Sequence, residues 1–149
     1  MRRTIEITNS VELEGVPDDV WSYVEDYAND LHWRRGVLEM APSPPGRPAV
    51  GTTVREVMKV NGRTFESSST VVDVGPRSYR FEGLADTGPI RGSRTLEATA
   101  HACRFSYSVS LDLQGTHAVI APLIERSVRR RMQSDLRRLG EQLKGVVTP

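Results

Sequence analysis

Hydrophobic and polar residues alternate along the first segment of the chain. The apolar residues share one parity and the polar residues share the other: Ile5, Ile7, Val11 and Leu13 against Glu6, Thr8, Ser10 and Glu12. A strand that buries one face produces this period of two. We therefore predict a β-strand here, interrupted on its apolar side only by Asn9.

Two short helices are predicted after this strand. Pro17 suits the first turn of a helix, and the two aspartates that follow it favour the positive end of the helix dipole. Apolar residues then recur at helical spacing: Val20, Trp21, Val24 and Tyr27. Asn29 and Asp30 end this helix, and residues 31–36 predict a second short turn that Gly36 closes.

The middle of the chain returns to the strand period. Six segments are predicted to be strands: 37–41, 52–60, 63–74, 78–84, 91–100 and 104–113. Asn61-Gly62 predicts a two-residue hairpin turn, because both residues tolerate positive φ. Residues 42–48 hold four prolines and predict a loop. Because no helix separates the later strands, neighbours are expected to pair antiparallel.

The last third of the chain has the spacing of one long helix. Apolar residues recur every three or four positions: Ile120, Ile124, Val128, Met132, Leu136, Leu139 and Leu143. If all seven were buried they would contribute about 10–15 kcal/mol before entropy. Pro122 requires that the regular helix begin near residues 118–121, or else that it kink at this proline.

Composition adds limits rather than a function. A chain of 149 residues, 38% hydrophobic and 26% charged, fits a single globular domain over residues 1–149. The net charge of +1 provides no global field to attract nucleic acid or acidic lipid. Cys103 is the only cysteine, which excludes an internal disulfide. No apolar run suggests a signal peptide or a membrane span, so we expect a cytoplasmic protein.

Five stretches of sequence together resemble a known superfamily. They are residues 16–21, 31–37, 50–56, 71–77, and 121–123 with the basic run and Asp135-Leu136 behind them. In this order and spacing they resemble the START-like helix-grip superfamily, and more narrowly the polyketide cyclase/dehydrase and lipid-transport family. The last hairpin, residues 100–104, departs from the pattern because it lacks the usual glycine-rich turn.

The resemblance implies an α+β fold. A curved antiparallel sheet of about seven strands would wrap around a long C-terminal helix, with two short helices after the first strand. It also implies a cavity between sheet and helix for an apolar, polyketide-like or lipid-like ligand. It does not imply a reaction, because some members cyclise or aromatise polyketide chains whereas others bind or carry a ligand.

Motifs for other chemistries are missing from the sequence. It has no phosphate loop, dinucleotide fingerprint, His-Glu-x-x-His pair or Cys-x-x-Cys pair. The histidines, His32, His101 and His117, are scattered, whereas a metal site needs converging ligands. We therefore expect no metal and no cofactor.

Polar residues on inward parities are the candidates for chemistry, because burying them without a partner costs free energy. Glu56 and Arg94 each share a parity with apolar neighbours, and we predict that Glu56 is a general base and that Arg94 polarises a carbonyl. Alternatively, the two form a structural ion pair or reach the rim. Ser67 and Ser69 would orient ligand oxygens, or else bond the backbone.

Aromatic and apolar residues complete the predicted ligand site. Trp33 is expected at its mouth, where it would stack on a planar ring. Tyr107 would contact the ligand, or else be a core residue, and Trp21 is assigned to the core. The other predicted ligand contacts are Tyr79, Phe81 and Leu123.

The basic run Arg129–Arg131 suggests nucleic acid or a membrane, but acidic residues lie at favourable helical offsets from it. We therefore interpret it as a solvated helix face. The expected partner is a small hydrophobic ligand, without nucleic acid or stable membrane insertion, and the protein would be a monomer or homodimer. Three functions remain open: a polyketide cyclase, a ligand carrier or sensor, and a protein-interaction module with a collapsed cavity.

Overall fold

The computed structural model describes residues 1–100 and 102–146. The chain runs β1 (Arg2–Leu13), α1 (Pro17–Val24), the 3₁₀ turn η1 (Tyr27–Asn29), α2 (Asp30–Trp33), β2 (Val37–Ser43), β3 (Thr53–Val60), β4 (Arg63–Gly75), β5 (Ser78–Ala85), β6 (Gly88–Ala98), β7 (Cys103–Gln114), α3 (Thr116–Val119) and α4 (Ala121–Val146). The predicted fold class is confirmed, including the two short helices after the first strand.

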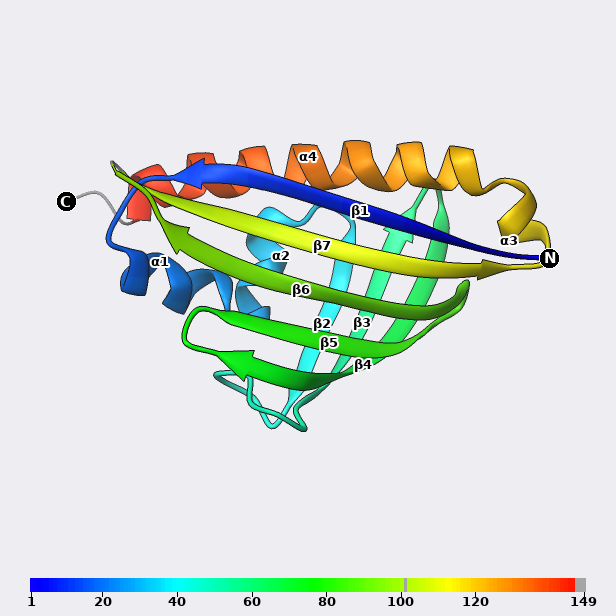
Figure 1. Ribbon diagram of the computed structural model, residues 1–149, viewed down its shortest axis with the longest axis horizontal. Helices are drawn as coiled ribbons and strands as arrows, with labels where there is room; N and C mark the ends of the chain where they lie inside the picture. The colour runs from blue at the N-terminus through cyan, green and yellow to red at the C-terminus, as the bar shows by residue number, and fades with distance from the viewer. Residues whose placement is uncertain (101, 147–149) are drawn as a thin grey trace.

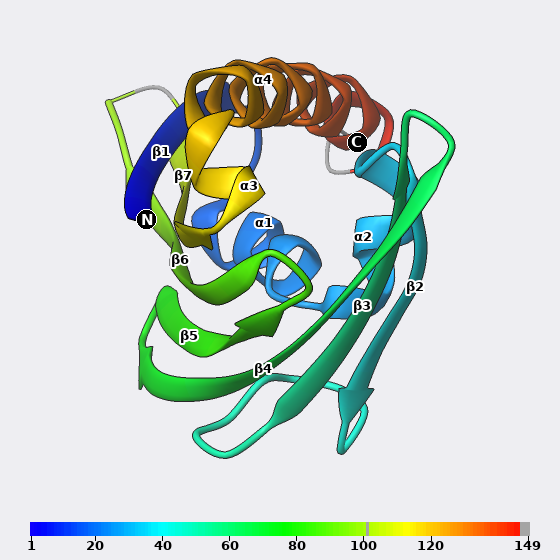
Figure 2. The same cartoon turned by 90° about the vertical axis from the view of Figure 1, so that its right-hand side faces the viewer.

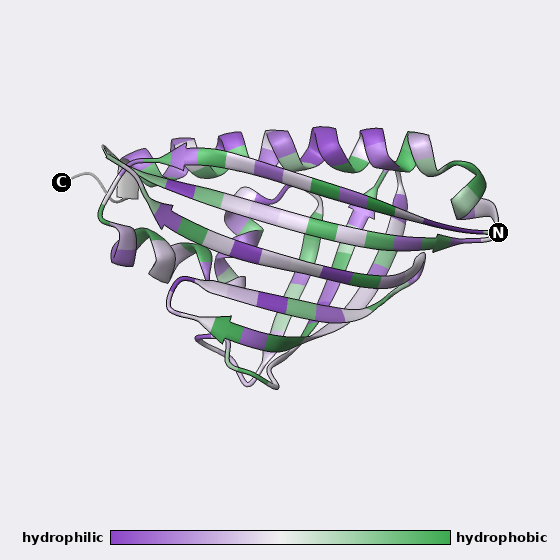
Figure 3. Cartoon of the chain, in the orientation of Figure 1, coloured by the Kyte–Doolittle hydropathy of each residue, from purple (hydrophilic) through white to green (hydrophobic). Residues whose placement is uncertain are grey.

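The seven strands form one antiparallel sheet in the order β1-β7-β6-β5-β4-β3-β2 (Figure 1). β1 and β2 are therefore the two edges of the sheet. Viewed from the end, the sheet curves round from β1 to β2, and α4 lies across the opening (Figure 2). Along the strands, hydrophobic residues alternate with hydrophilic ones, as a sheet with one covered face requires (Figure 3).

The turn at Asn61-Gly62 is confirmed as a tight hairpin. Asn61 has φ 51° and Gly62 has φ 81°, and Val60 pairs with Arg63 across the turn. From there the β3–β4 pairing continues without a shift from Val60–Arg63 to Thr53–Thr70. The register of β4 against β5 shifts only between Val71 and Asp73, so Ser67 and Ser69 lie in the regular part of the pairing.

Several predicted boundaries are corrected. β2 continues through Pro42 to Ser43, so the loop is shorter than predicted. β6 runs from Gly88 to Ala98 rather than over residues 91–100. By contrast, the start of α4 at Ala121 lies within the predicted range of 118–121 and puts Pro122 in the first turn, where a missing N–H costs nothing. His101 lies outside the described residues.

The apolar stripe of α4 is buried over its C-terminal half only. Met132, Leu136, Leu139 and Leu143 are buried, whereas Ile124 and Val128 are half-buried and Ile120 is 45% exposed. Four buried side chains at about 1.5–2 kcal/mol each contribute about 6–8 kcal/mol before entropy, roughly half the predicted sum. The first turns of α4 therefore leave apolar side chains in contact with solvent.

Polar contacts fasten α4 to the turn that follows α2. The backbone N–H of Arg35 donates to Asp135 Oδ1 at 3.1 Å, and Arg131 Nη1 donates to the Arg35 carbonyl at 3.0 Å. Burial raises the pKa of Asp135, against the lowering effect of the Arg35 N–H bond. On its other side α4 runs along β1. Among the described residues, no helix is long and apolar enough to cross a membrane.

Candidate ligand site

Arg94 of β6 is fully buried in the middle of the molecule and paired with Asp30 of α2. Its Nη1 donates to Asp30 Oδ1 at 2.9 Å and its Nη2 to Asp30 Oδ2 at 2.5 Å. Nη1 also donates to the carbonyl of Val24 at 3.1 Å. Burial by itself lowers the pKa of Arg94, but Asp30, Tyr79 and Tyr107 together outweigh it and hold this pKa above its ordinary value. The pair is therefore a buried ion pair.

Four aromatic rings surround the Arg94 guanidinium. The carbon Cζ lies 4.9 Å from the ring centroid of Tyr107, 5.2 Å from Tyr27, 5.4 Å from Trp33 and 5.9 Å from Tyr79. These distances fit cation–π attraction, which is strongest where water is excluded. Burial raises the pKa of Tyr27 to about 12 and that of Tyr79 well above its ordinary value.

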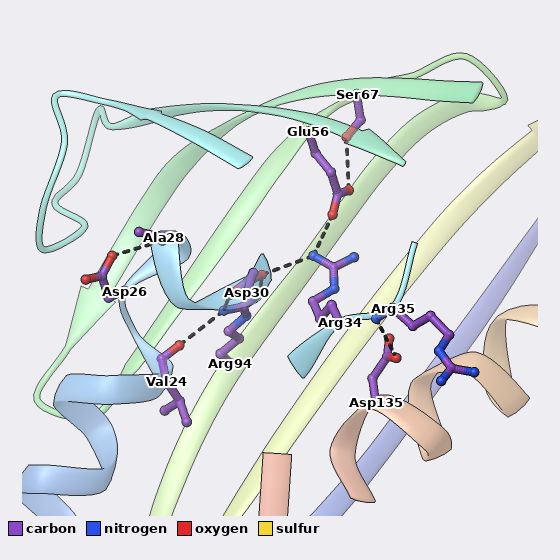
Figure 4. A network of polar contacts seen from close by, with 10 residues as sticks. All are labelled: Val24, Asp26, Ala28, Asp30, Arg34, Arg35, Glu56, Ser67, Arg94 and Asp135. Carbon is purple, nitrogen blue, oxygen red and sulfur yellow. Dashed lines mark hydrogen bonds and ion pairs between the residues drawn. The ribbon is translucent and has the colours of Figure 1, made fainter. Parts of the chain in front are cut away.

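Arg34 continues the network towards the sheet (Figure 4). Its Nη1 lies 3.1 Å from Asp30 Oδ2 and 2.5 Å from Glu56 Oε1, so it bridges the two carboxylates. Ser67 Oγ then donates to Glu56 Oε2 at 3.4 Å. Burial alone would lower the pKa of Arg34, but Glu56, Tyr107 and Asp30 together outweigh it and raise this pKa. Arginines and carboxylates thus alternate in the order Arg94, Asp30, Arg34, Glu56, and their formal charges sum to zero.

A small pocket lies at the end of this network. Its volume is about 30 Å³, and it is lined by Tyr27, Arg34, Met40, Val54, Glu56, Ser67, Ser69, Phe81, Ile90 and Tyr107. This volume holds one or two water molecules but no ring system. Among the described residues, Nη2 and Nε of Arg34 have no hydrogen-bond partner. The Arg34 side chain is 10% exposed.

The sheet register explains why the polar residues meet. Glu56 of β3 pairs with Ser67 of β4 on one side and with Met40 of β2 on the other. Because alternate residues share a face, Ser69 lies beside Ser67 on the inner side of the sheet. Arg34 reaches this place because it follows Asp30 by four residues, one helical turn.

Half-buried apolar side chains lie next to the pocket on the inner face of the sheet. Ile90 lines the pocket and pairs in register with Leu111, which is half-buried, as are Val109 and the α4 residues Ile124 and Val128. These side chains face inward and are partly exposed to solvent.

A larger hollow of about 300 Å³ lies elsewhere, over β1, β7, β6 and β5. Its lining is mainly the polar outer face of the sheet: Glu6, Thr8, Arg80, Glu82, Arg91, Ser93, Ser108 and Ser110. It contains no part of the Asp30–Arg34–Glu56 network. We place the candidate site at the smaller pocket because aromatic, apolar and buried charged groups converge there.

Five predicted site residues line this pocket together: Glu56, Ser67, Ser69, Phe81 and Tyr107. They come from β3, β4, β5 and β7, so the curvature of the sheet brings them together. Their roles towards a ligand remain predictions.

Four other predicted site residues lie away from it. Arg94 is fully buried, is not part of the pocket lining, and pairs with Asp30 rather than with Glu56. Trp33 is 1% exposed and packs edge-on against Phe105, so its expected place at a mouth is wrong. Tyr79 is buried beside Arg94, and Leu123 on the first turn of α4 is 64% exposed.

Sequence reasoning missed the two residues that link the site to the core, Asp30 and Arg34. The signal was their spacing of four residues, one helical turn, with Trp33 between them. Asp30 was interpreted only as part of a helix break. Among residues 1–100 and 102–146, no group of three or more His, Cys, Asp or Glu side chains is placed to hold a metal ion.

Solved structures with the same fold are numerous. The di-domain ARO/CYC StfQ from the steffimycin biosynthetic pathway has a TM-score of 0.77 at 10% identity, over 95% of this chain and 52% of that chain. This chain therefore spans about half of that protein. The Zhui aromatase/cyclase from Streptomyces sp. R1128 has a TM-score of 0.74 at 16% identity, over 97% of this chain and 94% of that one.

A START superfamily protein from Mycobacterium smegmatis has a TM-score of 0.73 at 14% identity, over 95% of this chain and 98% of that chain. At such identities the likeness establishes the fold alone. No curated protein matches the sequence. The family model described as polyketide cyclase / dehydrase and lipid transport matches residues 4–144, and the chain belongs to that family.

Proposed function

We propose that this protein binds a small, largely apolar molecule and that Arg34 donates a hydrogen bond to an oxygen of that molecule. The observation that carries the proposal is the state of Arg34. Its side chain is 10% exposed and lines the pocket, yet Nη2 and Nε have no partner among the described residues. Neither atom is one of the fully buried unpaired atoms of the described residues, so an acceptor oxygen from outside the chain can reach them.

The pocket fits the oxygen of such a ligand rather than its body. About 30 Å³ accommodates one or two atoms, and the apolar body would lie against Met40, Ile90 and Phe81. Met40 is flexible and half-buried, so it can move at low cost. Burying roughly 300 Å² of apolar ligand surface gives about 7 kcal/mol before association costs, which supports a micromolar affinity.

Binding can be tested with prodan, a neutral fluorescent naphthyl ketone. The emission of prodan should shift to the blue and saturate at micromolar protein. Loss of the Arg34 donors in Arg34→Met, made together with Glu56→Gln to avoid an unpaired carboxylate, should weaken binding by about 10-fold. The matched control is Arg129→Met on the exposed side of α4, which should bind as the parent does.

Two results would refute the proposal. Absence of any saturable shift would favour the interaction module with a collapsed interior. Equal affinity of the folded Arg34→Met/Glu56→Gln protein and the control would show that Arg34 does not contact the ligand. Native mass spectrometry of protein from its own host adds a second test, because a carrier should retain a co-purifying apolar molecule.

A catalytic version of the same proposal is favoured by the placement of Glu56. A carboxylate beside a guanidinium, at the edge of an apolar space, suits carbon–carbon bond formation in a poly-β-ketone. Glu56 would take a proton from a methylene group, and Arg34 would stabilise the resulting enolate oxygen. The enolate carbon then attacks a second carbonyl. The alkoxide that forms there takes the proton from Glu56, and loss of water follows.

In this version the predicted role of Arg94 passes to Arg34, and Arg94 becomes a positioning residue. It holds Asp30, which in turn holds Arg34. Ser67 would orient the Glu56 carboxylate. With a β-polyketone thioester as substrate, Glu56→Gln should abolish the dehydrated cyclic product seen by mass spectrometry. Product formation by Glu56→Gln at the parent rate would leave only the binding function.

A further inference from the structure

We infer that Glu56 makes this pocket select neutral oxygen-bearing ligands against anionic ones. The inference rests on the proposed function and adds the ligand class. A free arginine in an apolar pocket would favour a carboxylate, because the two form paired, charge-assisted hydrogen bonds. Arg34 is not free in this sense, since Glu56 and Asp30 already compensate its charge.

The distances support this assignment. Arg34 Nη1 lies 2.5 Å from Glu56 Oε1 and 3.1 Å from Asp30 Oδ2, so two carboxylates flank one guanidinium group. The charge of Asp30 is in turn balanced by Arg94 through both of its guanidinium Nη atoms. The four side chains are 0–19% exposed, so water screens their charges weakly.

An anionic group at Arg34 would therefore add a third negative charge to a buried set that is already neutral. It would lie close to Glu56 and would lose its own hydration in the pocket. A carbonyl or phenol oxygen needs only a donor, which Nη2 or Nε of Arg34 provides. Leaving the charge of one ligand class without a partner is a general way to gain specificity.

Glu56 is the residue through which this selection can be changed. Asp30 is fully buried and holds Arg94, so its replacement would disturb the core. Glu56 is 19% exposed, lines the pocket and has only Arg34 and Ser67 as partners among the described residues. Replacing its carboxylate by an amide keeps the shape of the side chain and removes the charge.

The test uses two ligands that differ chiefly in charge. 2-Acetylnaphthalene is a neutral ketone and 2-naphthoate is an anion, and both carry the same bicyclic ring with a carbonyl oxygen. Each is titrated as a competitor of bound prodan. The unaltered protein should bind the ketone at least about 10-fold more tightly than the anion, a difference of about 1.4 kcal/mol.

Glu56→Gln should then strengthen binding of 2-naphthoate by about 10-fold and leave 2-acetylnaphthalene within about 3-fold. Glu66→Gln is the matched control, because Glu66 is next to Ser67 on β4 but faces outward and pairs with Arg55. It should change neither affinity. Glu56→Asp keeps the charge and should keep the preference for the ketone.

The outcomes separate the two proposals. Equal binding of both ligands to the unaltered protein, or a Glu56→Gln protein with an unchanged ratio, would overturn the selection by charge and leave ligand binding intact. If prodan itself does not bind, the proposed function fails. Because the first measurement needs no variant, the inference remains falsifiable even if Glu56→Gln does not fold.

Discussion

Arg94 and Asp30 form a two-pronged ion pair at the centre of the molecule, with Nη1 2.9 Å from Oδ1 and Nη2 2.5 Å from Oδ2. The pair joins β6, in the middle of the sheet, to α2, a helix of four residues. Such a short helix has little stability of its own. Its position, and with it the position of Arg34, therefore depends on this contact and on the aromatic rings around it.

Loss of Arg94 should destabilise the fold strongly. Arg94→Met leaves Asp30 buried with one partner fewer, which typically costs about 3–5 kcal/mol of unfolding free energy. Chemical denaturation followed by tryptophan fluorescence measures this loss. Arg91→Met is the control on the same strand, because Arg91 is exposed and its salt bridges are long, at 3.7–3.8 Å. A loss no larger than in the control would contradict a structural role for the pair.

Tyr27 should resist ionisation. Burial raises its pKa to about 12, so the folded state keeps the phenol proton after unfolded tyrosines, with a pKa near 10, have lost theirs. The raised folded pKa therefore contributes stability that is full below pH 10 and is lost as pH rises through about 12. Absorbance at 295 nm should show late titration in buffer and a single transition near pH 10 in urea.

Tyr27→Phe provides the check on that assignment. Without the phenol, the unfolding free energy should fall less steeply between pH 10 and pH 12 than in the parent. The same slope in both proteins would show that another group, such as Tyr79 with its raised pKa, is responsible for the alkaline loss.

The inner face of the strands was predictable from the sequence because the relevant strands are regular. β3 and β4 pair without a shift from Val60 to Thr53, and the bulge of β4 comes only after Ser69. Alternation therefore assigns Glu56, Ser67 and Ser69 to the correct face. Tyr107 follows in the same way, because β7 keeps one register against both neighbours.

The partners of the buried charges were not predictable in this way. Asp30 and Arg94 are 64 residues apart, and their contact depends on how η1 and α2 lie on the sheet. A single helical turn has no period from which to infer a buried side, so Trp33 was placed at a surface although it is 1% exposed. The apolar stripe of α4 likewise predicts a helix. It does not predict which of the helical turns the sheet covers.

Asp135 should make the unfolding free energy depend on pH in the sense opposite to that of a carboxylate whose pKa is lowered by folding. Because burial raises its pKa in the folded state, the folded protein binds the proton more tightly than the unfolded chain does. Its contribution to stability is therefore full below the unfolded pKa of 3.8 and is lost as pH rises through the folded value.

Asp135→Asn keeps an oxygen for the Arg35 N–H and removes the charge. Its unfolding free energy relative to the parent should improve as pH rises above 3.8 and through the raised folded pKa of Asp135. Glu141→Gln, on the exposed side of α4, should show no such trend. A constant difference between Asp135→Asn and the parent across this range would show that Asp135 does not titrate there.

Gly36 and Gly62 both have positive φ, at 88° and 81°, but differ in their surroundings. A Cβ at Gly62 would meet no atom within 4 Å, so Gly62→Ala costs only the backbone strain, about 1 kcal/mol.

A Cβ at Gly36 would lie 2.6 Å from Arg131 Nη1 and 2.8 Å from the Lys59 carbonyl oxygen. The Arg131 side chain can move, but the Lys59 carbonyl is strand backbone, and the Lys59 N–H already donates to the Gly36 carbonyl at 2.7 Å. Gly36→Ala should therefore cost clearly more, about 2–3 kcal/mol in unfolding free energy, and should loosen the turn that holds α4. Equal losses in the two variants, measured by chemical denaturation, would mean that strain alone decides the cost.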